Sequence, residues 1–181
     1  MEKYLPPYVI TNEILCYVSS IMEKIGKVST FDNLSRFPIL RKQNRIKSIQ
    51  SSCAIEANSL TIEQVEDVIN GITVIGPSKD ISEIKNAIKA YEIAFDKNPF
   101  LEKDLKYIHS LMTKGLIETS GEYRITGEGV IDNNGNLIFL APPKEMVPIL
   151  MSNLINWGKN KFNIINPLIL SSIFHYEFVF I

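Results

Sequence analysis

The sequence has 181 residues, of which 45% are hydrophobic and 22% are charged, and its formal net charge is −1 at pH 7. This length supports one domain with its own core, and the near-neutral charge excludes a general electrostatic attraction to nucleic acid or to anionic membranes. Cys16 and Cys53 have no metal-type spacing and the N-terminal stretch MEKYLPPYVITNE has no signal-peptide pattern, so we expect a reduced cytoplasmic protein.

The N-terminal part of the chain is predicted to form two helices. In the first, apolar residues recur at helical spacing from Ile10 to Ile25, and Gly26 is its expected end. The second is expected to start at Pro38 and to run through the stretch ILRKQNRIKSIQSSCAIE.

Two capping patterns follow. Thr61 and Gln64 form a capping box at the start of a short helix that Gly71 closes. Asp80 and Glu83 repeat the pattern, so we expect the next helix to begin there.

Two further helices are predicted in the second half of the chain. Their apolar positions are Leu105, Ile108 and Leu111 in one, and Met146, Leu150, Leu154 and Trp157 in the other. We expect the first to end near Gly115, and the second to start after Pro142 and Pro143 and to end at Gly158.

The stretch EYRITGEGVIDNNGNLIFLAPP breaks the helical pattern. Two short apolar runs flank the sequence NNGN, in which Asn134 and Gly135 both tolerate positive φ. We therefore predict a β-hairpin from Gly129 to Leu140, so the fold class is all-α with one small hairpin.

The last segment, NPLILSSIFHYEFVFI, opens like a helix. Asn166 is the expected N-cap and Pro167 occupies the first helical position, but no stop signal follows Phe180. This pattern predicts that part of a longer protein is missing. A buried helix is favoured over a membrane anchor, because the segment is barely long enough to span a bilayer and contains polar residues such as Glu177.

Catalytic motifs are scarce in the sequence. It has no Walker loop, dinucleotide-binding glycine run, nucleophile elbow or zincin motif. His109 and His175 are expected to be structural. The basic residues Arg41, Lys42, Arg45 and Lys47 are expected to form a solvated helix face rather than a phosphate site.

One pair of residues invites a functional interpretation. Ser52 and Glu56 are four positions apart in SSCAIEANSLT and so share one helix face. A carboxylate at a helix C-terminus opposes the macrodipole, so Glu56 calls for a partner, most naturally an arginine. The alternative is an exposed glutamate without a special role.

Four stretches, in this order, resemble the N-terminal half of Fic-domain proteins and together cover nearly the whole chain. They are LRKQNRIKSIQSSCAIEANSLTIEQVEDVINGITVIGPSKDISEIKNAIKAYE, GEYRITGEGV, APPKEMVPILMSNLINW and NPLILSSIFHYEFVFI. The resemblance implies a Fic-type helical domain lacking its C-terminal catalytic helices, with N-terminal helices in residues 1–75, an inhibitory helix at about 38–57, and a core in residues 80–181.

The resemblance also implies a function. Fic proteins are typically adenylyltransferases that move AMP from ATP onto a hydroxyl side chain of a target protein. Their catalytic motif, H-x-F-x-[DE]-G-N-G-R-x-x-R, supplies the base, the Mg²⁺ ligand and the phosphate-binding arginines, and would begin directly after Ile181. We therefore expect this chain to be inactive alone, with no tightly bound ATP or Mg²⁺.

The remaining roles are regulatory and substrate-facing. By resemblance, Glu56 is autoinhibitory because it displaces an arginine of the motif from the ATP γ-phosphate, and Ser52 fixes its helix. The family pattern has Gly or Asn after this glutamate, whereas Ala57 stands here. The hairpin, with Gly129, Val130 and Ile131, resembles the flap that covers the nucleotide and pairs with the target backbone.

Two functions therefore remain open. The first is the N-terminal portion of a protein adenylyltransferase whose target presents a Ser, Thr or Tyr hydroxyl. The second is a non-enzymatic module that binds an extended peptide through the hairpin. Neither involves nucleic acid or a membrane, and the apolar C-terminus favours self-association.

Overall fold

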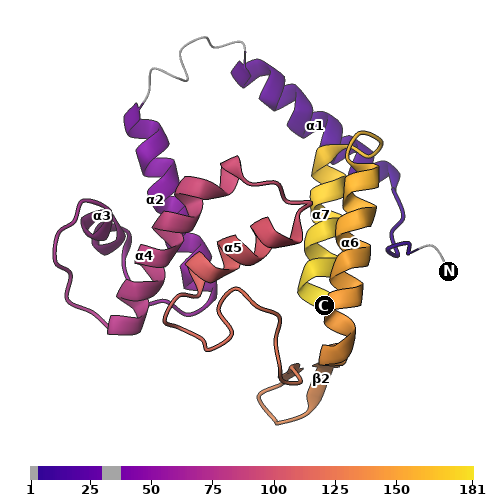
Figure 1. Cartoon of the computed structure of the whole chain (residues 1–181). Coiled ribbons are helices and arrows are strands. Elements are labelled where there is room, and N and C mark those ends of the chain that lie inside the picture. The colour runs from indigo at the N-terminus through magenta and orange to yellow at the C-terminus, as the bar shows by residue number, and fades with distance from the viewer. Residues whose placement is uncertain (1–3, 30–37) are drawn as a thin grey trace. The chain divides into compact units, whose positions relative to one another are not determined.

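The computed structural model describes residues 4–29 and 38–181, and these are helical apart from one hairpin and the connecting loops (Figure 1). The chain divides into two compact units. One contains Met1–Val28, Pro99–Glu102 and Tyr123–Ile181, and the other contains Ser29–Asn98 and Lys103–Glu122. The predicted class, all-α with a small β-hairpin, is confirmed.

The unit that contains residues 29–98 is built on three helices that pack together. They are α2 (Pro38–Ile55), α3 (Ile62–Ile69) and α4 (Ser78–Ile93). Their shared core consists of Ile46, Ile49, Cys53, Leu60, Val65, Ile84 and Ala87. α2 therefore has one face fixed by apolar contacts, and its other face is exposed.

The capping box predicted for α3 is present. The Thr61 hydroxyl accepts a hydrogen bond from the Gln64 amide, and the Gln64 side chain accepts one from the Thr61 amide. Gly71 follows the helix with a φ of 76°, as expected for a residue that closes a helix in the left-handed region.

The second predicted capping box is wrong. α4 begins at Ser78 after Pro77, so Asp80 lies inside its first turn and does not cap it. The carboxylate of Asp80 instead accepts hydrogen bonds from the backbone amide and the hydroxyl of Ser59. The side chain that the sequence pattern assigned to the helix cap therefore makes a tertiary contact instead.

α5 (Glu102–Met112) belongs mainly to the same unit and ends three residues before Gly115, close to the predicted position. His109 lies on this helix, and its Nδ1 accepts a hydrogen bond from the backbone amide of Gly121. Burial lowers the pKa of His109, which favours the neutral imidazole that this contact requires. The histidine binds the following loop and so has a structural role.

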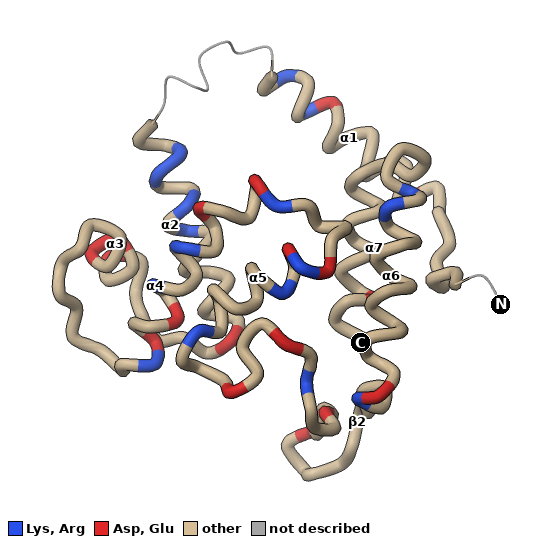
Figure 2. Tube along the Cα trace, viewed as in Figure 1, with Lys and Arg blue, Asp and Glu red and all other residues tan. Residues whose placement is uncertain are grey.

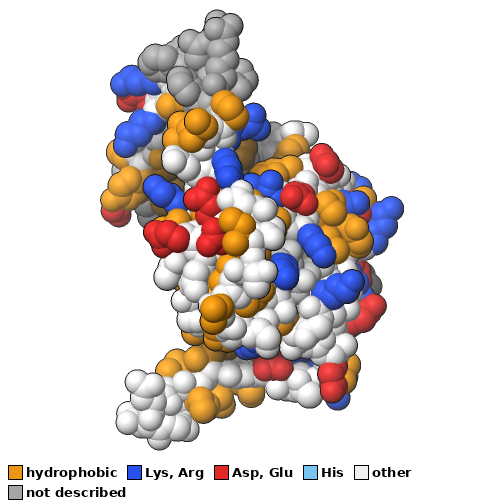
Figure 3. Space-filling model, turned by 90° about the vertical axis from the view of Figure 1, so that its left-hand side faces the viewer, with side chains coloured by type: hydrophobic (Ala, Val, Ile, Leu, Met, Phe, Trp, Pro, Cys, Tyr) orange, Lys and Arg blue, Asp and Glu red, His pale blue; other side chains and the backbone are white. Residues whose placement is uncertain are grey.

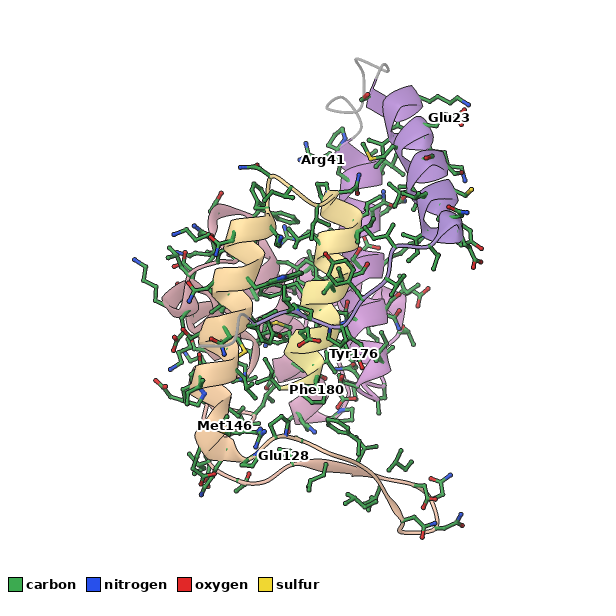
Figure 4. All side chains as sticks on the ribbon, turned by 90° about the vertical axis from the view of Figure 1, so that its right-hand side faces the viewer. Glu23, Arg41, Glu128, Met146, Tyr176 and Phe180 are labelled. Atoms are coloured by element: carbon green, nitrogen blue, oxygen red, sulfur yellow. The ribbon has the colours of Figure 1, made fainter. Side chains whose placement is uncertain are left out.

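The other unit contains α1 (Asn12–Ser29), strands β1 (Gly129–Ile131) and β2 (Leu137–Leu140), a 3-10 turn at Lys144–Met146, α6 (Val147–Lys161) and α7 (Pro167–Phe180). α6 and α7 lie side by side (Figures 1 and 4). Their common core contains Leu154, Trp157 and Leu170, and Phe100 and Phe174 pack against it.

Two glycines predicted to end helices do not do so. α1 continues past Gly26 to Ser29, and α6 continues past Gly158 to Lys161. A Cβ on Gly158 would lie 2.8 Å from a ring carbon of Phe100 and 3.0 Å from one of Phe174. The absence of a side chain therefore serves close packing of aromatic rings at this position.

The hairpin is confirmed, but its turn differs from the prediction. Of the two expected positive-φ residues only Gly135 has one, at 85°. The turn spans residues 132–136, and the carboxylate of Asp132 accepts hydrogen bonds from the backbone amides of Asn134 and Asn136. The Asn-Gly pair thus lies in a five-residue turn organised by an aspartate.

The start of α7 matches the sequence pattern, because the side chain of Asn166 accepts a hydrogen bond from the amide of Leu168. Only Leu170 and Glu177 are buried on this helix, so it is less buried than expected. The Tyr4 hydroxyl donates a hydrogen bond to the Glu177 carboxylate. Among the described residues, none of the helices has both the length and the apolar character needed to cross a membrane.

Candidate functional site on the second helix and the hairpin

The predicted site residues fall in both units. Ser52 and Glu56 belong to the unit of α2, whereas Gly129, Val130 and Ile131 belong to the unit of the hairpin. The residues of each set are close in sequence, and each set is described within its own unit.

Ser52 lies on the exposed face of α2. Its hydroxyl oxygen is 3.2 Å from the hydroxyl oxygen of Tyr91 on α4, within hydrogen-bond distance. The next residue, Cys53, points into the core and is buried. The last turn of α2 is therefore fixed by an apolar contact on one side and a polar contact on the other.

Glu56 follows Ile55, the last helical residue, and occupies the C-cap position of α2. Its side chain is exposed, and no hydrogen bond or ion pair from residues 4–29 or 38–181 occupies its carboxylate. The carbonyl groups at a helix C-terminus repel a carboxylate, so a cation near this point would bind favourably. The carboxylate is therefore available to a cation that is not among the described residues.

The helix end itself has a defined backbone structure. The Asn58 amide donates to the Cys53 carbonyl at 3.1 Å, and the Ala57 amide donates to the Ala54 carbonyl at 3.1 Å. This pair of bonds is the Schellman motif, in which the residue just after the helix C-cap adopts the left-handed conformation. Ala57 has a φ of 64° and is the one non-glycine residue of the described chain with a positive φ.

The hairpin forms a two-stranded antiparallel sheet with a bulge between Val130 and Ile131. A Cβ on Gly129 would lie 2.9 Å from the carbonyl oxygen of Phe139, so a glycine is needed for the close approach of the strands. Val130 and Ile131 are exposed, and Figure 3 shows apolar side chains along this arm at the bottom of the view. Each strand has one unpaired edge that an extended peptide could join.

Arg124 holds the base of the hairpin. Its guanidinium donates to the carbonyl oxygens of Thr126 and Pro142, which precede and follow the two strands, and to the backbone oxygen of Ile181 at the end of α7. Figure 4 shows the hairpin running below the end of α7 that carries Phe180. The rings of Phe139 and Phe180 meet edge to face, with centroids 5.6 Å apart.

The basic residues of α2 are partly engaged. Lys42 pairs with Glu66 and Asn70, and Arg45 donates to Glu92 and to the carbonyl of Ile88. Figure 2 shows these cations along α2, next to acidic residues of the neighbouring helices. Two of the four predicted surface cations thus stabilise helix packing.

The structure of a Fic family protein from Desulfovibrio desulfuricans G20 is similar to 98% of this chain, with 42% sequence identity and a TM-score of 0.91. This chain belongs to the Fic family. It spans 54% of the Desulfovibrio chain.

A second similar structure is that of a Fic domain containing signaling protein from Bacteroides thetaiotaomicron VPI-5482. The match covers 76% of this Fic chain and 56% of the Bacteroides chain. The identity is 23% and the TM-score 0.65, so this likeness shows the common fold alone. No protein-family model and no curated protein matches the sequence.

Three residues of this Fic chain were not singled out from its sequence. Tyr91 contacts Ser52, Asn58 completes the end of α2, and Arg124 binds both ends of the hairpin. Asn58 and Arg124 both lie inside the stretches that resemble Fic proteins. The partners of Arg124, and one partner of the Asn58 side chain, are backbone carbonyls, which leave no residue pattern in the sequence.

Proposed function

We propose that these residues form the N-terminal portion of a Fic-type protein adenylyltransferase that is autoinhibited through Glu56. The observation that carries the proposal is the exposed carboxylate of Glu56 at the C-terminus of α2, without a partner in the described residues. The 42% identity to a Fic family protein supports the Fic-type assignment. A complete protein would transfer AMP from ATP to a Ser, Thr or Tyr hydroxyl of a cytoplasmic target.

The inhibitory role follows from the chemistry of arginine. A guanidinium paired with a carboxylate cannot hold a phosphate at the same time, because both ligands use the same face of N–H donors. Glu56 would bind an arginine of the catalytic motif and keep it from the ATP γ-phosphate. ATP would then lie in a pose unsuited to in-line attack, and transfer would be slow.

The described residues do not themselves provide a metal site. Within 4–29 and 38–181 there is no group of three His, Cys, Asp or Glu side chains that could hold a metal ion. In this proposal the magnesium ligand belongs to the catalytic motif, as the resemblance to Fic proteins implies.

The hairpin is proposed as the target-binding flap. Its unpaired strand edges can add a segment of the target as a third strand, while Gly129 allows the two strands of the hairpin itself to approach closely. Val130 and Ile131, with exposed side chains, would select apolar residues of the target.

An alternative is a non-enzymatic module that holds an extended peptide. The observation that favours it is the exposure of the apolar hairpin residues, from 54% for Val130 to 67% for Leu140. The coding sequence downstream of Ile181 distinguishes the two, since only an adenylyltransferase needs the H-x-F-x-[DE]-G-N-G-R-x-x-R motif there.

The decisive experiment uses the full-length protein, in which these residues continue into that motif. Labelled AMP incorporation is measured for wild type, Glu56→Gly and Glu63→Gly. We expect Glu56→Gly to raise incorporation well above wild type, because it frees the arginine. Glu63→Gly, in the first turn of α3, should leave incorporation unchanged. Equal incorporation by wild type and Glu56→Gly would refute autoinhibition.

A further inference from the structure

Asn58 lies in the segment between α2 and α3 and is 9% exposed. Its side-chain amide donates to the Asp80 carbonyl at 3.1 Å and to the Glu83 carboxylate at 2.7 Å. Its side-chain oxygen accepts the Leu60 amide at 3.1 Å. Both donors and the acceptor of this buried side chain are therefore used, which makes the position specific for asparagine.

The same residue closes α2. The backbone amide of Asn58 bonds to Cys53 in the Schellman motif, while its side chain bonds to the first turns of α4. Ser59 adds two bonds to Asp80, at 2.8 and 2.6 Å. The carboxylate of Glu83 is also near enough to Cys53 to help burial raise the pKa of that thiol. The end of α2 is thus attached to α4 by a polar latch formed by Asn58, Ser59, Asp80 and Glu83.

The latch matters because of Ala57. A non-glycine residue in the left-handed region is strained, so the helix end would tend to leave this conformation if nothing held it. Glu56 immediately precedes Ala57, and its direction depends on the backbone at that point. The side chain of Asn58 supplies the external contacts that keep Ala57, and with it Glu56, in place.

We propose that Asn58 is a positioning residue for the inhibitory Glu56, and that it is needed because Ala57 makes the end of α2 intrinsically unfavourable. The inference rests on the proposed autoinhibition by Glu56. Asn58 does not touch the nucleotide or the arginine in this proposal. It sets the backbone that presents the carboxylate.

Asn58→Asp tests the latch in the full-length protein. Aspartate keeps the acceptor for Leu60 but loses both amide donors, and it places a carboxylate against Glu83. The expected result is a rise in AMP incorporation of roughly fivefold or more, the lower end of typical coupling between two sites. In the Glu56→Gly background the same change should add nothing, because the group that Asn58 positions is absent.

Two matched variants separate positioning from general destabilisation. Asn86 on α4 is equally buried and donates to the carbonyls of Met112 and Lys114, so Asn86→Asp removes comparable bonds away from Glu56. It should leave incorporation at the wild-type level. Adding Ala57→Gly to Asn58→Asp should restore inhibition at least in part, because glycine adopts the left-handed conformation without strain.

The outcomes distinguish the two proposals. Activation by Glu56→Gly without activation by Asn58→Asp would overturn the positioning role alone. Higher AMP incorporation by the double variant than by Glu56→Gly would do the same. No activation by Glu56→Gly would overturn autoinhibition and this inference together. If Asn58→Asp does not fold, Glu83→Ala removes the 2.7 Å partner and should activate to a smaller extent, and wild-type incorporation by that variant would also refute the latch.

Discussion

The backbone amide of Asn58 donates to the carbonyl oxygen of Cys53 at 3.1 Å, and this bond encloses Ala57 at a φ of 64°. In the family pattern the residue at this position is Gly or Asn, both of which enter the left-handed region more readily than alanine. The helix end therefore places an alanine in a conformation that Gly or Asn would adopt more readily.

Replacing Ala57 with glycine should stabilise the chain. The left-handed conformation costs alanine about 1 kcal/mol relative to glycine, so Ala57→Gly is expected to raise the free energy of unfolding by about that amount. Urea denaturation measures the change. Ala54→Gly, inside the last turn of α2, is the control and should destabilise by about 0.5–1 kcal/mol. A destabilising Ala57→Gly would show that residue 57 is not left-handed in solution.

The 181-residue chain alone should have no AMP-transfer activity. Its sequence lacks the motif that supplies the base and the phosphate-binding arginines, and His175 is exposed on α7 without a catalytic partner. Incubation with labelled ATP, Mg²⁺ and a cell extract should label no protein above background. Labelling by the purified chain, absent from a mock purification, would contradict the assignment of catalysis to the motif.

The exposed apolar side chains of α7 should cause the isolated chain to self-associate. Val179 is 66% exposed and lies next to Phe178 and Phe180, which are also exposed. Val179→Lys should lower the average mass in light scattering, because a charge opposes burial of this patch. Ser171→Lys adds the same charge near the start of the helix and should change little. A monomeric wild type would rule out association through this surface.

The two cysteines should differ in reactivity. Burial, assisted by the negative charge of Glu83, raises the pKa of the Cys53 thiol to about 11. At pH 8 only roughly a thousandth of it would be thiolate, the form that reacts. Cys16 is exposed, so a thiol reagent should modify Cys16 in the native chain and Cys53 only after unfolding. The Cys16→Ser and Cys53→Ser variants assign each reaction, and rapid native labelling of Cys16→Ser would contradict the burial.

The sequence was sufficient to predict the role of a side chain that bonds within its own helix turn. Thr61 and Asn166 cap their helices as their local patterns indicate, and the apolar spacing located each helix. It was not sufficient where a residue serves a distant segment. Asp80 looks like a cap but bonds to Ser59, and Gly158 looks like a stop but makes room for Phe100.

In the candidate site, too, residues with local contacts could be predicted and residues with long-range contacts could not. Ser52 and Glu56 could be named because their spacing is local and resembles a known family pattern. Asn58 and Arg124 could not, since their partners are brought near only by folding: the Asp80 carbonyl and the Glu83 carboxylate for Asn58, and backbone carbonyls for Arg124. A carbonyl is present at every residue, so the sequence does not indicate which ones a side chain will reach.

Arg124 offers the clearest test of such a contact. One guanidinium binds carbonyls before and after the hairpin, at Thr126 and Pro142, and the backbone oxygen of Ile181. Hydrogen bonds from a charged donor contribute about 1.5–3 kcal/mol each when their loss leaves an acceptor unsatisfied. Arg124→Ala should therefore loosen the base of the hairpin by about 2 kcal/mol, since solvent can replace part of these bonds.

Hydrogen exchange provides the measurement. The Ala141 amide bonds to the Glu128 carbonyl at the hairpin base, and its exchange should accelerate in Arg124→Ala, whereas the amides of the Leu154 core should not change. Arg124→Lys should behave almost like alanine, because an ammonium group cannot span the carbonyls that the planar guanidinium reaches. Lys144→Ala is the matched control: it removes one exposed hydrogen bond, to the Ile125 carbonyl, and should have a small effect. Unchanged exchange at Ala141 in both Arg124 variants would show that the strand pairing alone holds the hairpin, and that the arginine does not set its position.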